Sequence, residues 1–226
     1  MGPATRRGSH SAAAVAVLTH TAGPGQPRAP RAAIAEKLAG FQRVEASPAG
    51  LKPASVTVCI VLRGYERCLL MTRRAPTLRS HAGQWALPGG RRDGGESAAD
   101  AALRELREET GVQVAPGDVL GMLDDYATRS GYLISPVVVW GGPVSAAMSG
   151  PASEVAEIHV IPLADLDITP RLRRIPESAS PVIQLPFLGG YLHAPTAAIV
   201  YQFCQVALHG RTTRVSHFEQ PVFAWR

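Results

Sequence analysis

The sequence predicts an α/β fold in which several strands surround one strongly marked helix. Residues 55–63 and 67–74 are apolar, β-branched runs typical of strands, and residues 132–140 and 154–163 read in the same way. Residues 97–111 instead carry a helical spacing of apolar side chains between two end signals. With 226 residues, 46% hydrophobic and 18% charged, the chain is large enough to bury the core of one generous domain.

The N-terminal part of the sequence differs in composition from the rest. Residues 1–31 are rich in Gly, Pro, Ala and Arg and hold few large apolar groups, so we expect a poorly ordered extension ahead of a domain over 32–226. A short helix over 32–41 is expected to open that domain. The apolar stretch Ala12–Leu18 is short and is not followed by a small-residue cleavage site, so no signal peptide is predicted.

Composition and charge narrow the class of partner. No apolar run approaches the length that crosses a bilayer. The three cysteines form neither a CxxC pair nor an even set, which predicts no zinc site, no disulfide and a reducing cytoplasm. The net charge of +5 suits an anionic small molecule, whereas the dispersed arginines do not resemble a nucleic-acid-binding module. A homodimer is left open.

The connections between these elements are also marked in the sequence. Gly64 separates the first two strand runs and predicts a hairpin. Residues 141–153 are rich in Gly, Ser and Pro and predict a flexible loop, while 195–208 predicts a second helix with Pro195 in its first turn. A basic run after the last strand is expected to face solvent; it comprises Arg171, Arg173 and Arg174.

The helix over 97–111 has the clearest local signals. Ser97 followed by Asp100 is typical of an N-terminal cap, and Gly111 stands where a left-handed end is expected. Its apolar positions recur at intervals of three and four and should lie against a sheet; they are Ala99, Ala102, Leu103 and Leu106.

The opposite face of this helix is acidic. Glu105, Glu108 and Glu109 are spaced i, i+3, i+4, so their like charges repel one another by a few tenths of a kcal/mol per pair. Acidic helical faces are commonly only solvated. Here, however, the Gly89–Gly90 turn lies directly upstream, where a main-chain carbonyl can face the same ion as the carboxylates. Carboxylates and carbonyls are ligands that Mg²⁺ accepts, so the segment predicts a metal site.

The loop between this turn and the helix supplies a further pair of charges. Glu96 precedes the helix and is expected to pair with Arg104, fixing the loop. Together, these positions resemble the Nudix box at all nine of its specified residues; they are Gly90, Glu96, Arg104, Glu105, Leu106, Glu108, Glu109, Gly111 and Val112.

The resemblance to Nudix hydrolases implies several properties. It implies an α/β/α sandwich with a mixed sheet, and hydrolysis of a diphosphate linkage in a nucleotide derivative. It also implies Mg²⁺ or Mn²⁺ bound by the carbonyl of Gly89 and by Glu105, Glu108 and Glu109. The remaining positions would be structural; they are Gly90, Glu96, Arg104 and Gly111.

A narrower resemblance precedes the box. Residues 70–90 are similar to the corresponding stretch of coenzyme A diphosphatases, with matches at Arg74, Leu78, Arg79, His81, Gly83 and Gln84. It implies cleavage of coenzyme A or acyl-CoA to 4′-phosphopantetheine and adenosine 3′,5′-bisphosphate. Two departures are Ala75, where that subfamily has Ser, and residues 191–200, which replace its Trp-Gly segment.

The sequence leaves several roles open. Arg74, Arg79 and His81 are candidates to bind an additional phosphate such as the 3′-phosphate of coenzyme A. The general base is Glu108, Glu109, or a later carboxylate, Glu154 or Glu157, of which Glu154 is favoured. Alternative substrates are ADP-ribose, NADH and nucleoside triphosphates, and a third reading is a nucleotide-binding module without turnover.

Three aromatic residues have alternative readings. Trp85 alternates with Leu87, so one of the two is expected in the core and the other at a pocket. Tyr126 and Tyr132 are candidates to stack on adenine, although a tyrosine at a strand end is more often structural.

Overall fold

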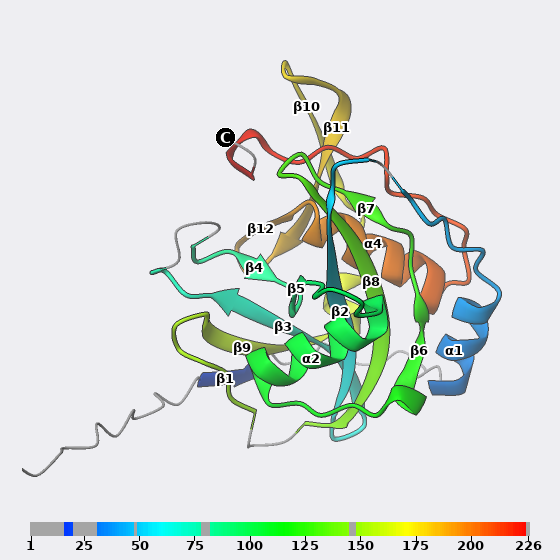
Figure 1. Ribbon diagram of the computed structural model, residues 1–226, viewed down its shortest axis with the longest axis vertical. Helices are drawn as coiled ribbons and strands as arrows, with labels where there is room; N and C mark the ends of the chain where they lie inside the picture. The colour runs from blue at the N-terminus through cyan, green and yellow to red at the C-terminus, as the bar shows by residue number, and fades with distance from the viewer. Residues whose placement is uncertain (1–15, 20–30, 48, 78–81, 145–147, 225–226) are drawn as a thin grey trace, which may run out of the picture.

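A computed structural model of the protein describes residues 16–19, 31–47, 49–77, 82–144 and 148–224 (Figure 1). Its centre is a mixed sheet of nine strands. Six of them follow one another across the sheet in the order β1-β9-β3-β2-β8-β6. Their bounds are β1 Ala16–Thr19, β2 Lys52–Arg63, β3 Glu66–Arg74, β6 Val119–Met122, β8 Tyr132–Pro143 and β9 Val155–Pro162. Three short strands pair beside this path, namely β4 (Trp85–Ala86) with β3, β5 (Gly89–Arg91) with β2 and β7 (Tyr126–Ala127) with β8.

The central strand β2 is buried on both of its faces. It forms the predicted antiparallel hairpin with β3 and pairs in parallel with β8 over almost its whole length. Because successive side chains of a strand point to opposite faces, Val58 and Ile60 enter one hydrophobic cluster while Cys59 and Val61 enter the other. The strands expected over 55–63, 67–74, 132–140 and 154–163 are therefore confirmed, and the sheet requires covering layers on both sides.

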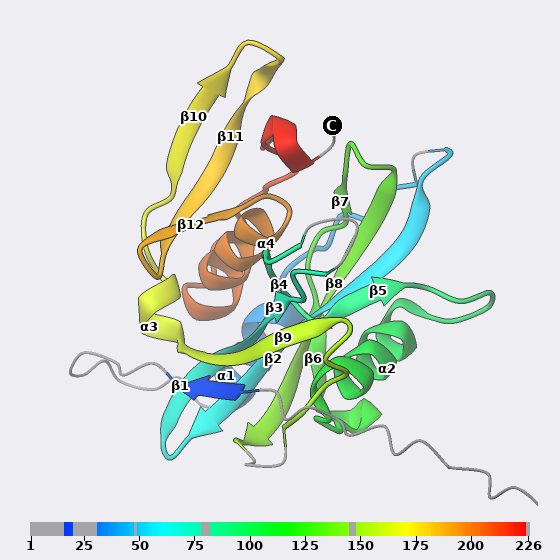
Figure 2. The same ribbon diagram turned by 90° about the vertical axis from the view of Figure 1, so that its left-hand side faces the viewer.

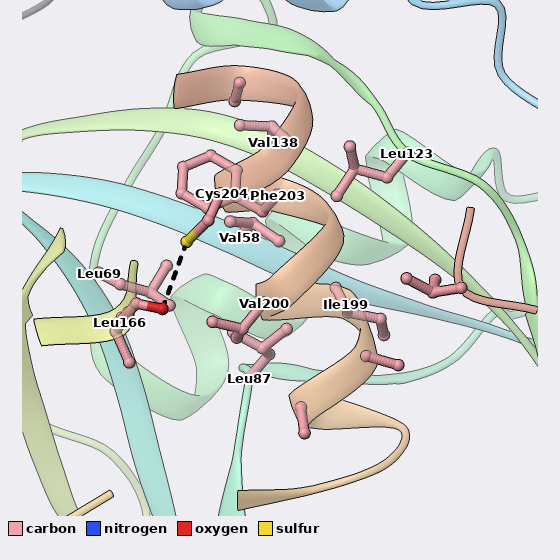
Figure 3. Packing of buried hydrophobic residues seen from close by; sticks show 14 of the residues in the cluster. Val58, Leu69, Leu87, Leu123, Val138, Leu166, Ile199, Val200, Phe203 and Cys204 are labelled. Atoms are coloured by element: carbon pink, nitrogen blue, oxygen red, sulfur yellow. Dashed lines mark hydrogen bonds between the residues drawn. The ribbon is translucent and has the colours of Figure 1, made fainter. Parts of the chain in front are cut away.

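Helices cover the two faces of the sheet. On one side lies α2 (Ala98–Thr110), and on the other lie α1 (Arg31–Ala39) and α4 (Thr196–Phe203), which continues as the π-helical turn η2 (Cys204–Leu208) (Figure 2). Figure 3 shows side chains of α4 packed among Val58, Val138 and Leu69 of the sheet. The predicted α/β/α arrangement with a mixed sheet is confirmed, as are the helices expected over 32–41 and 195–208.

A second, smaller sheet lies next to α4 and was not predicted. It contains β10 (Arg171–Ile175), β11 (Ser178–Phe187) and β12 (Gly190–His193), all antiparallel, and it follows the short helix α3 (Leu163–Leu166). The basic run lies in β10 and faces solvent, as expected. The C-terminal segment runs beside β11 and contains the 3₁₀ turn η3 (Val222–Ala224) (Figure 2). A further 3₁₀ turn, η1 (Pro116–Asp118), precedes β6.

Part of the N-terminal extension takes part in the main sheet. Residues 16–19 form β1, which pairs in parallel with β9 at the sheet edge, whereas the remaining residues before Arg31 lie outside the described ranges. The three cysteines are buried and unbridged. Of the helices in the described ranges, none has both the length and the apolar character that crossing a membrane requires.

Candidate active site

Helix α2 is held at both ends by the residues that the sequence marks. The Ser97 hydroxyl accepts a hydrogen bond from the Asp100 amide at 3.1 Å, which satisfies one of the free amides of the first turn. At the other end, Gly111 adopts a left-handed conformation with φ of 72°, and its amide donates to the Arg107 carbonyl. Ala102 and Leu106 are fully buried against the sheet. The acidic side chains therefore emerge away from that apolar contact.

The turn before the helix fits tightly between β2 and α2. A Cβ at Gly89 would lie 2.3 Å from the Ser55 carbonyl oxygen, and one at Gly90 would lie 2.3 Å from Oε1 of Glu105. The Gly89 amide also donates to Oε2 of Glu109 at 3.2 Å. Only glycine leaves room for this approach, so the turn and the acidic face form one unit.

Arg104 links the loop to the helix. Its guanidinium donates from Nε and Nη2 to the two carboxylate oxygens of Glu96, at 2.9 and 3.0 Å, which confirms the predicted pair. These hydrogen bonds hold the pKa of Glu96 at about 2. A third nitrogen, Nη1, donates to Glu105 at 2.8 Å and to Glu108 at 3.3 Å. The guanidinium thus ties the loop and two carboxylates of the acidic face together.

Burial makes the charged form of the carboxyl groups on this acidic face unfavourable. Glu109 is only 6% exposed, and loss of solvent raises the pKa of its carboxyl to about 7, although the Gly89 amide and the charge of Arg74 act in the opposite direction. The pKa of Glu105 is raised for the same main reason, with a smaller contribution from the negative charge of Glu154. Negative charge is thus concentrated where solvent screens it poorly, an arrangement that a cation stabilises.

The donors at this face suit a hard divalent cation. Glu105, Glu108 and Glu109 supply carboxylate oxygens, the ligand type that Mg²⁺ prefers. Within the described ranges no three His, Cys, Asp or Glu side chains converge as a ready metal cluster; Arg104 bonds two of these carboxylates and the Gly89 amide bonds the third. The chemistry of the donors therefore fits a metal that exchanges for those contacts.

Arg74 and Glu154 lie close enough to influence this face. Arg74, at the end of β3, lowers the pKa of Glu109 through its charge, and its Nε is buried with no hydrogen-bond partner among the described residues. Glu154 is exposed; its carbonyl accepts from the Ala75 amide at 2.9 Å, and its charge acts on both Glu105 and Glu109. The structure therefore brings an arginine and a fourth carboxylate to the helix end.

Other candidate residues are placed elsewhere. Glu157 bonds His159 at 2.7 Å and pairs with Arg73 at 3.5 Å, so it belongs to a separate cluster. Arg79 and His81 lie outside the described residues.

The burial of the aromatic candidates shows where each side chain lies. Leu87 is in the core, whereas Trp85 is half-buried and lines a cavity, as the alternation predicts. Tyr126 is 2% exposed and its hydroxyl donates to the Phe218 carbonyl at 2.8 Å, so of its two readings the structural one holds and the adenine-stacking one does not. Tyr132 is half-buried, and its hydroxyl accepts from the Arg91 guanidinium at 2.8 and 3.2 Å.

Gly150 makes a close contact with α2 that sequence reasoning missed. It lies in the segment predicted as a flexible loop, yet a Cβ there would be 2.0 Å from the Glu109 carbonyl oxygen. The neighbouring Ser149 amide donates to the Thr110 carbonyl at 3.0 Å. This stretch is therefore fixed on the C-terminal end of α2, and it leads directly to Glu154. One glycine among several in a polar segment gives no local signal of such a contact.

Comparison with known proteins places this geometry in a family. Residues 52–184 match the NUDIX domain family. A relative from Photorhabdus laumondii, described as an uncharacterized Nudix hydrolase NudL, is 45% identical over 98 residues, covering 43% of this chain and 52% of the relative. The protein of the same description from Yersinia enterocolitica is 36% identical over 135 residues, covering 58% of this chain and 68% of the relative. The chain thus spans about half the length of the first relative and about two thirds of the second.

Two solved structures are similar at a lower level. The MutT protein from Methanosarcina mazei Go1 is 26% identical with a TM-score of 0.41, covering 56% of this chain and 83% of that one. The NUDIX domain of Shewanella oneidensis NrtR, solved with ADP ribose, is 24% identical with a TM-score of 0.40, covering 53% of this chain and 77% of that one. The arrangement described above therefore rests on the sheet order of this chain itself.

Proposed function

We propose that this chain, which belongs to the Nudix family, hydrolyses a diphosphate linkage in a nucleotide derivative with Mg²⁺ or Mn²⁺ as cofactor. The observation that carries the proposal is the acidic face of α2, where the buried Glu109 and the half-buried Glu105 adjoin the Gly89–Gly90 turn. Desolvated carboxylates of this kind are stabilised by a cation, and a diphosphate needs its own negative charge neutralised before water can attack.

Different residues would bind the metal and the phosphate. Glu105, Glu108, Glu109 and the Gly89 carbonyl would hold the metal, which when bound neutralises phosphate oxygens and lowers the pKa of water. Arg74, whose charge already acts on Glu109, would bind a phosphate oxygen with its guanidinium group.

Glu154 is the proposed general base. It is exposed, held next to Ala75 through its backbone, and near enough to raise the pKa of two carboxylates of the acidic face. Water adds to one phosphorus atom, its proton passes to the Glu154 carboxylate, and the bridging P–O bond breaks to release two phosphate monoesters. Glu157 is a weaker candidate because its carboxylate already pairs with His159 and Arg73.

Coenzyme A or an acyl-CoA is the proposed substrate. The support is the residue series that leads from Arg74 to Gln84 and on to the turn, together with the position of Arg74 beside the acidic face. The curated relatives add nothing to this choice, since both are described as uncharacterized. ADP-ribose, NADH and nucleoside triphosphates are the competing substrates.

A substrate panel tests the proposal. The full-length chain is freed of metal with a chelator, titrated with Mg²⁺ or Mn²⁺, and incubated with coenzyme A, acetyl-CoA, ADP-ribose, NADH and ATP. We expect metal-dependent release of 4′-phosphopantetheine and adenosine 3′,5′-bisphosphate, identified by mass spectrometry. If coenzyme A stays intact while ADP-ribose or NADH is cleaved, the coenzyme A assignment is wrong and the hydrolase function remains. If compounds bind tightly and none is cleaved, the protein is a nucleotide-binding module without turnover.

A further inference from the structure

A cavity of about 270 Å³ is lined by none of the residues proposed above as metal ligands or general base. It is bounded by the strand β4, by the chain from β12 into α4, and by the C-terminal segment. Three aromatic side chains line it, namely Trp85, Tyr191 and Phe223, and we call it the aromatic cavity. Its size is close to the lower end of small-molecule sites, which suits a single ring system.

Each of the three aromatic rings contacts a neighbouring side chain and also lines the cavity. Trp85 makes edge-to-face contacts with His159 at 4.4 Å and Phe187 at 4.9 Å between centroids. Tyr191 is 41% exposed and Phe223 is 55% exposed, which is unusual for large rings close together. Rings that are held in place but remain solvent-exposed are the surfaces on which proteins stack planar heterocycles.

The wall also contains a polar ring, that of His193, with the buried Gln184 behind it. His193 lines the cavity and contacts the Gln184 amide at 2.8 Å. Gln184 is 6% exposed, and its other amide atom, Oε1, has no hydrogen-bond partner among the described residues. A ring with its own donors and acceptors complements such a wall.

Positive charge borders the same rings. The Arg171 guanidinium donates to the Tyr191 hydroxyl at 3.1 Å and lies 5.4 Å from the centroid of that ring. Arg173 is near enough to contribute, after burial, to the lowered pKa of His193. Both arginines lie in the exposed strand β10. Exposed guanidinium groups next to an aromatic site provide the geometry for binding phosphate.

The aromatic cavity is within reach of the acidic face along the chain. Trp85 is separated from Gly89 by four residue steps, and an extended chain covers about 3.3–3.6 Å per step, so their Cα atoms are at most about 14 Å apart. A nucleotide with its ring beside Trp85 can therefore extend a diphosphate towards the turn at Gly89.

We propose that the aromatic cavity binds the purine ring of the nucleotide substrate, and that Arg171 and Arg173 bind a phosphate carried by its ribose. This assignment rests on the proposed diphosphatase function, which it deepens by naming the half of the substrate that is recognised and where. The other half of the substrate then points away from the small sheet.

Equilibrium binding to the metal-free, full-length chain tests the assignment without turnover. Calorimetry with adenosine 3′,5′-bisphosphate, AMP and ribose 5-phosphate is compared for the wild type, Tyr191→Ala, Phe223→Ala and Arg171→Ala. Each ring deletion should weaken both adenine nucleotides roughly three- to tenfold, the range expected for a lost ring contact. Arg171→Ala should weaken adenosine 3′,5′-bisphosphate more than AMP.

Two variants serve as matched controls. Tyr65→Ala removes an aromatic ring that is 82% exposed at the β2–β3 turn, and Arg174→Ala removes an exposed arginine from β10 itself. Both should leave the nucleotide affinities within about twofold of the wild type, inside the usual scatter of surface substitutions. Because all five substituted side chains are at least partly exposed, the variants should fold, which circular dichroism verifies.

The outcomes separate this assignment from the proposed function. Ribose 5-phosphate binding as tightly as AMP, unchanged affinity in both ring variants, or no nucleotide binding by the wild type would each overturn the cavity assignment. If the wild type cleaves no diphosphate and yet the expected affinity changes appear, the hydrolase proposal fails and the cavity assignment stands.

Discussion

Gly150 approaches the backbone of Glu109 so closely that a Cβ at position 150 would lie 2.0 Å from the Glu109 carbonyl oxygen. The contact fixes the strand-entry loop on the end of α2, and four residues later the same loop presents Glu154. The position of the proposed base therefore depends on an unobstructed backbone contact.

Gly150→Ala should lower kcat/KM by at least about tenfold, because the loop must move away from the helix and carry Glu154 with it. It should also destabilise the fold by about 1–3 kcal/mol, the usual cost of overpacking. Steady-state kinetics and urea unfolding measure the two effects. Gly117→Ala is the control, since a Cβ there meets nothing within 4 Å. Wild-type activity in Gly150→Ala would show that the contact does not position the base.

The two glycines of the turn should respond differently to the same change. A Cβ at Gly89 meets main-chain atoms of Ser55 and Val56, whereas one at Gly90 meets the carboxylate of Glu105. Gly89→Ala is therefore expected to reduce the free energy of unfolding, while Gly90→Ala displaces a flexible side chain and mainly reduces turnover. Thermal unfolding and kcat of both variants provide the comparison. Equal losses of stability would contradict the different neighbours of the two glycines.

Removing the charge of Glu109 should abolish turnover without unfolding the protein. In Glu109→Gln the amide oxygen still accepts from the Gly89 amide, and no buried charge remains to be desolvated. We expect kcat to fall by orders of magnitude and Tm in chelator to stay equal or rise. Adding Mg²⁺ should raise Tm of the wild type and not of this variant. A Glu109→Gln enzyme with full activity would rule out the proposed metal site.

The pair between Glu96 and Arg104 predicts a defined pH dependence. The pKa of Glu96 is lowered to about 2 in the folded chain, chiefly by the Arg104 hydrogen bond. A lowered pKa stabilises the fold at pH values above the unfolded pKa of about 4.3, and this contribution is lost as pH falls through the folded pKa. Wild type should thus be more stable than Glu96→Gln by a constant margin from about pH 8 to 5.5, and the margin should shrink from about pH 4 to 2.

Urea unfolding of the wild type and Glu96→Gln across that range measures the margin. Asp100→Asn is a useful comparison, because it changes an exposed carboxylate at the start of the same helix. A margin that grows as pH falls would contradict the assigned direction of the Glu96 shift.

The sequence predicted those structural features that depend on residues close together in the chain. The cap at Ser97, the left-handed end at Gly111 and the Glu96–Arg104 pair each depend on residues within one helix and its preceding loop. The β2–β3 hairpin follows in the same way from two apolar runs around Gly64. Short-range spacing was sufficient in each case.

The small sheet escaped prediction because its sequence resembles a loop. Its central strand β11 contains Pro181 and Pro186, residues that normally argue against a central strand, and β10 is a run of exposed arginines. Antiparallel pairing between strands that are neighbours in the sequence stabilises it instead, with one bridge from Val182 to Glu219 of the C-terminal segment. The aromatic cavity could not be predicted for a different reason, since Trp85, Tyr191 and Phe223 meet only when distant segments pack together.

The placement of Arg104 between Glu96 and two carboxylates of the acidic face has one more consequence. The protein carries its own counter-ion, so the folded shape does not need a dissolved metal to keep those negative charges together. Chelation should accordingly arrest catalysis and leave the architecture intact, ready for reactivation when an ion returns.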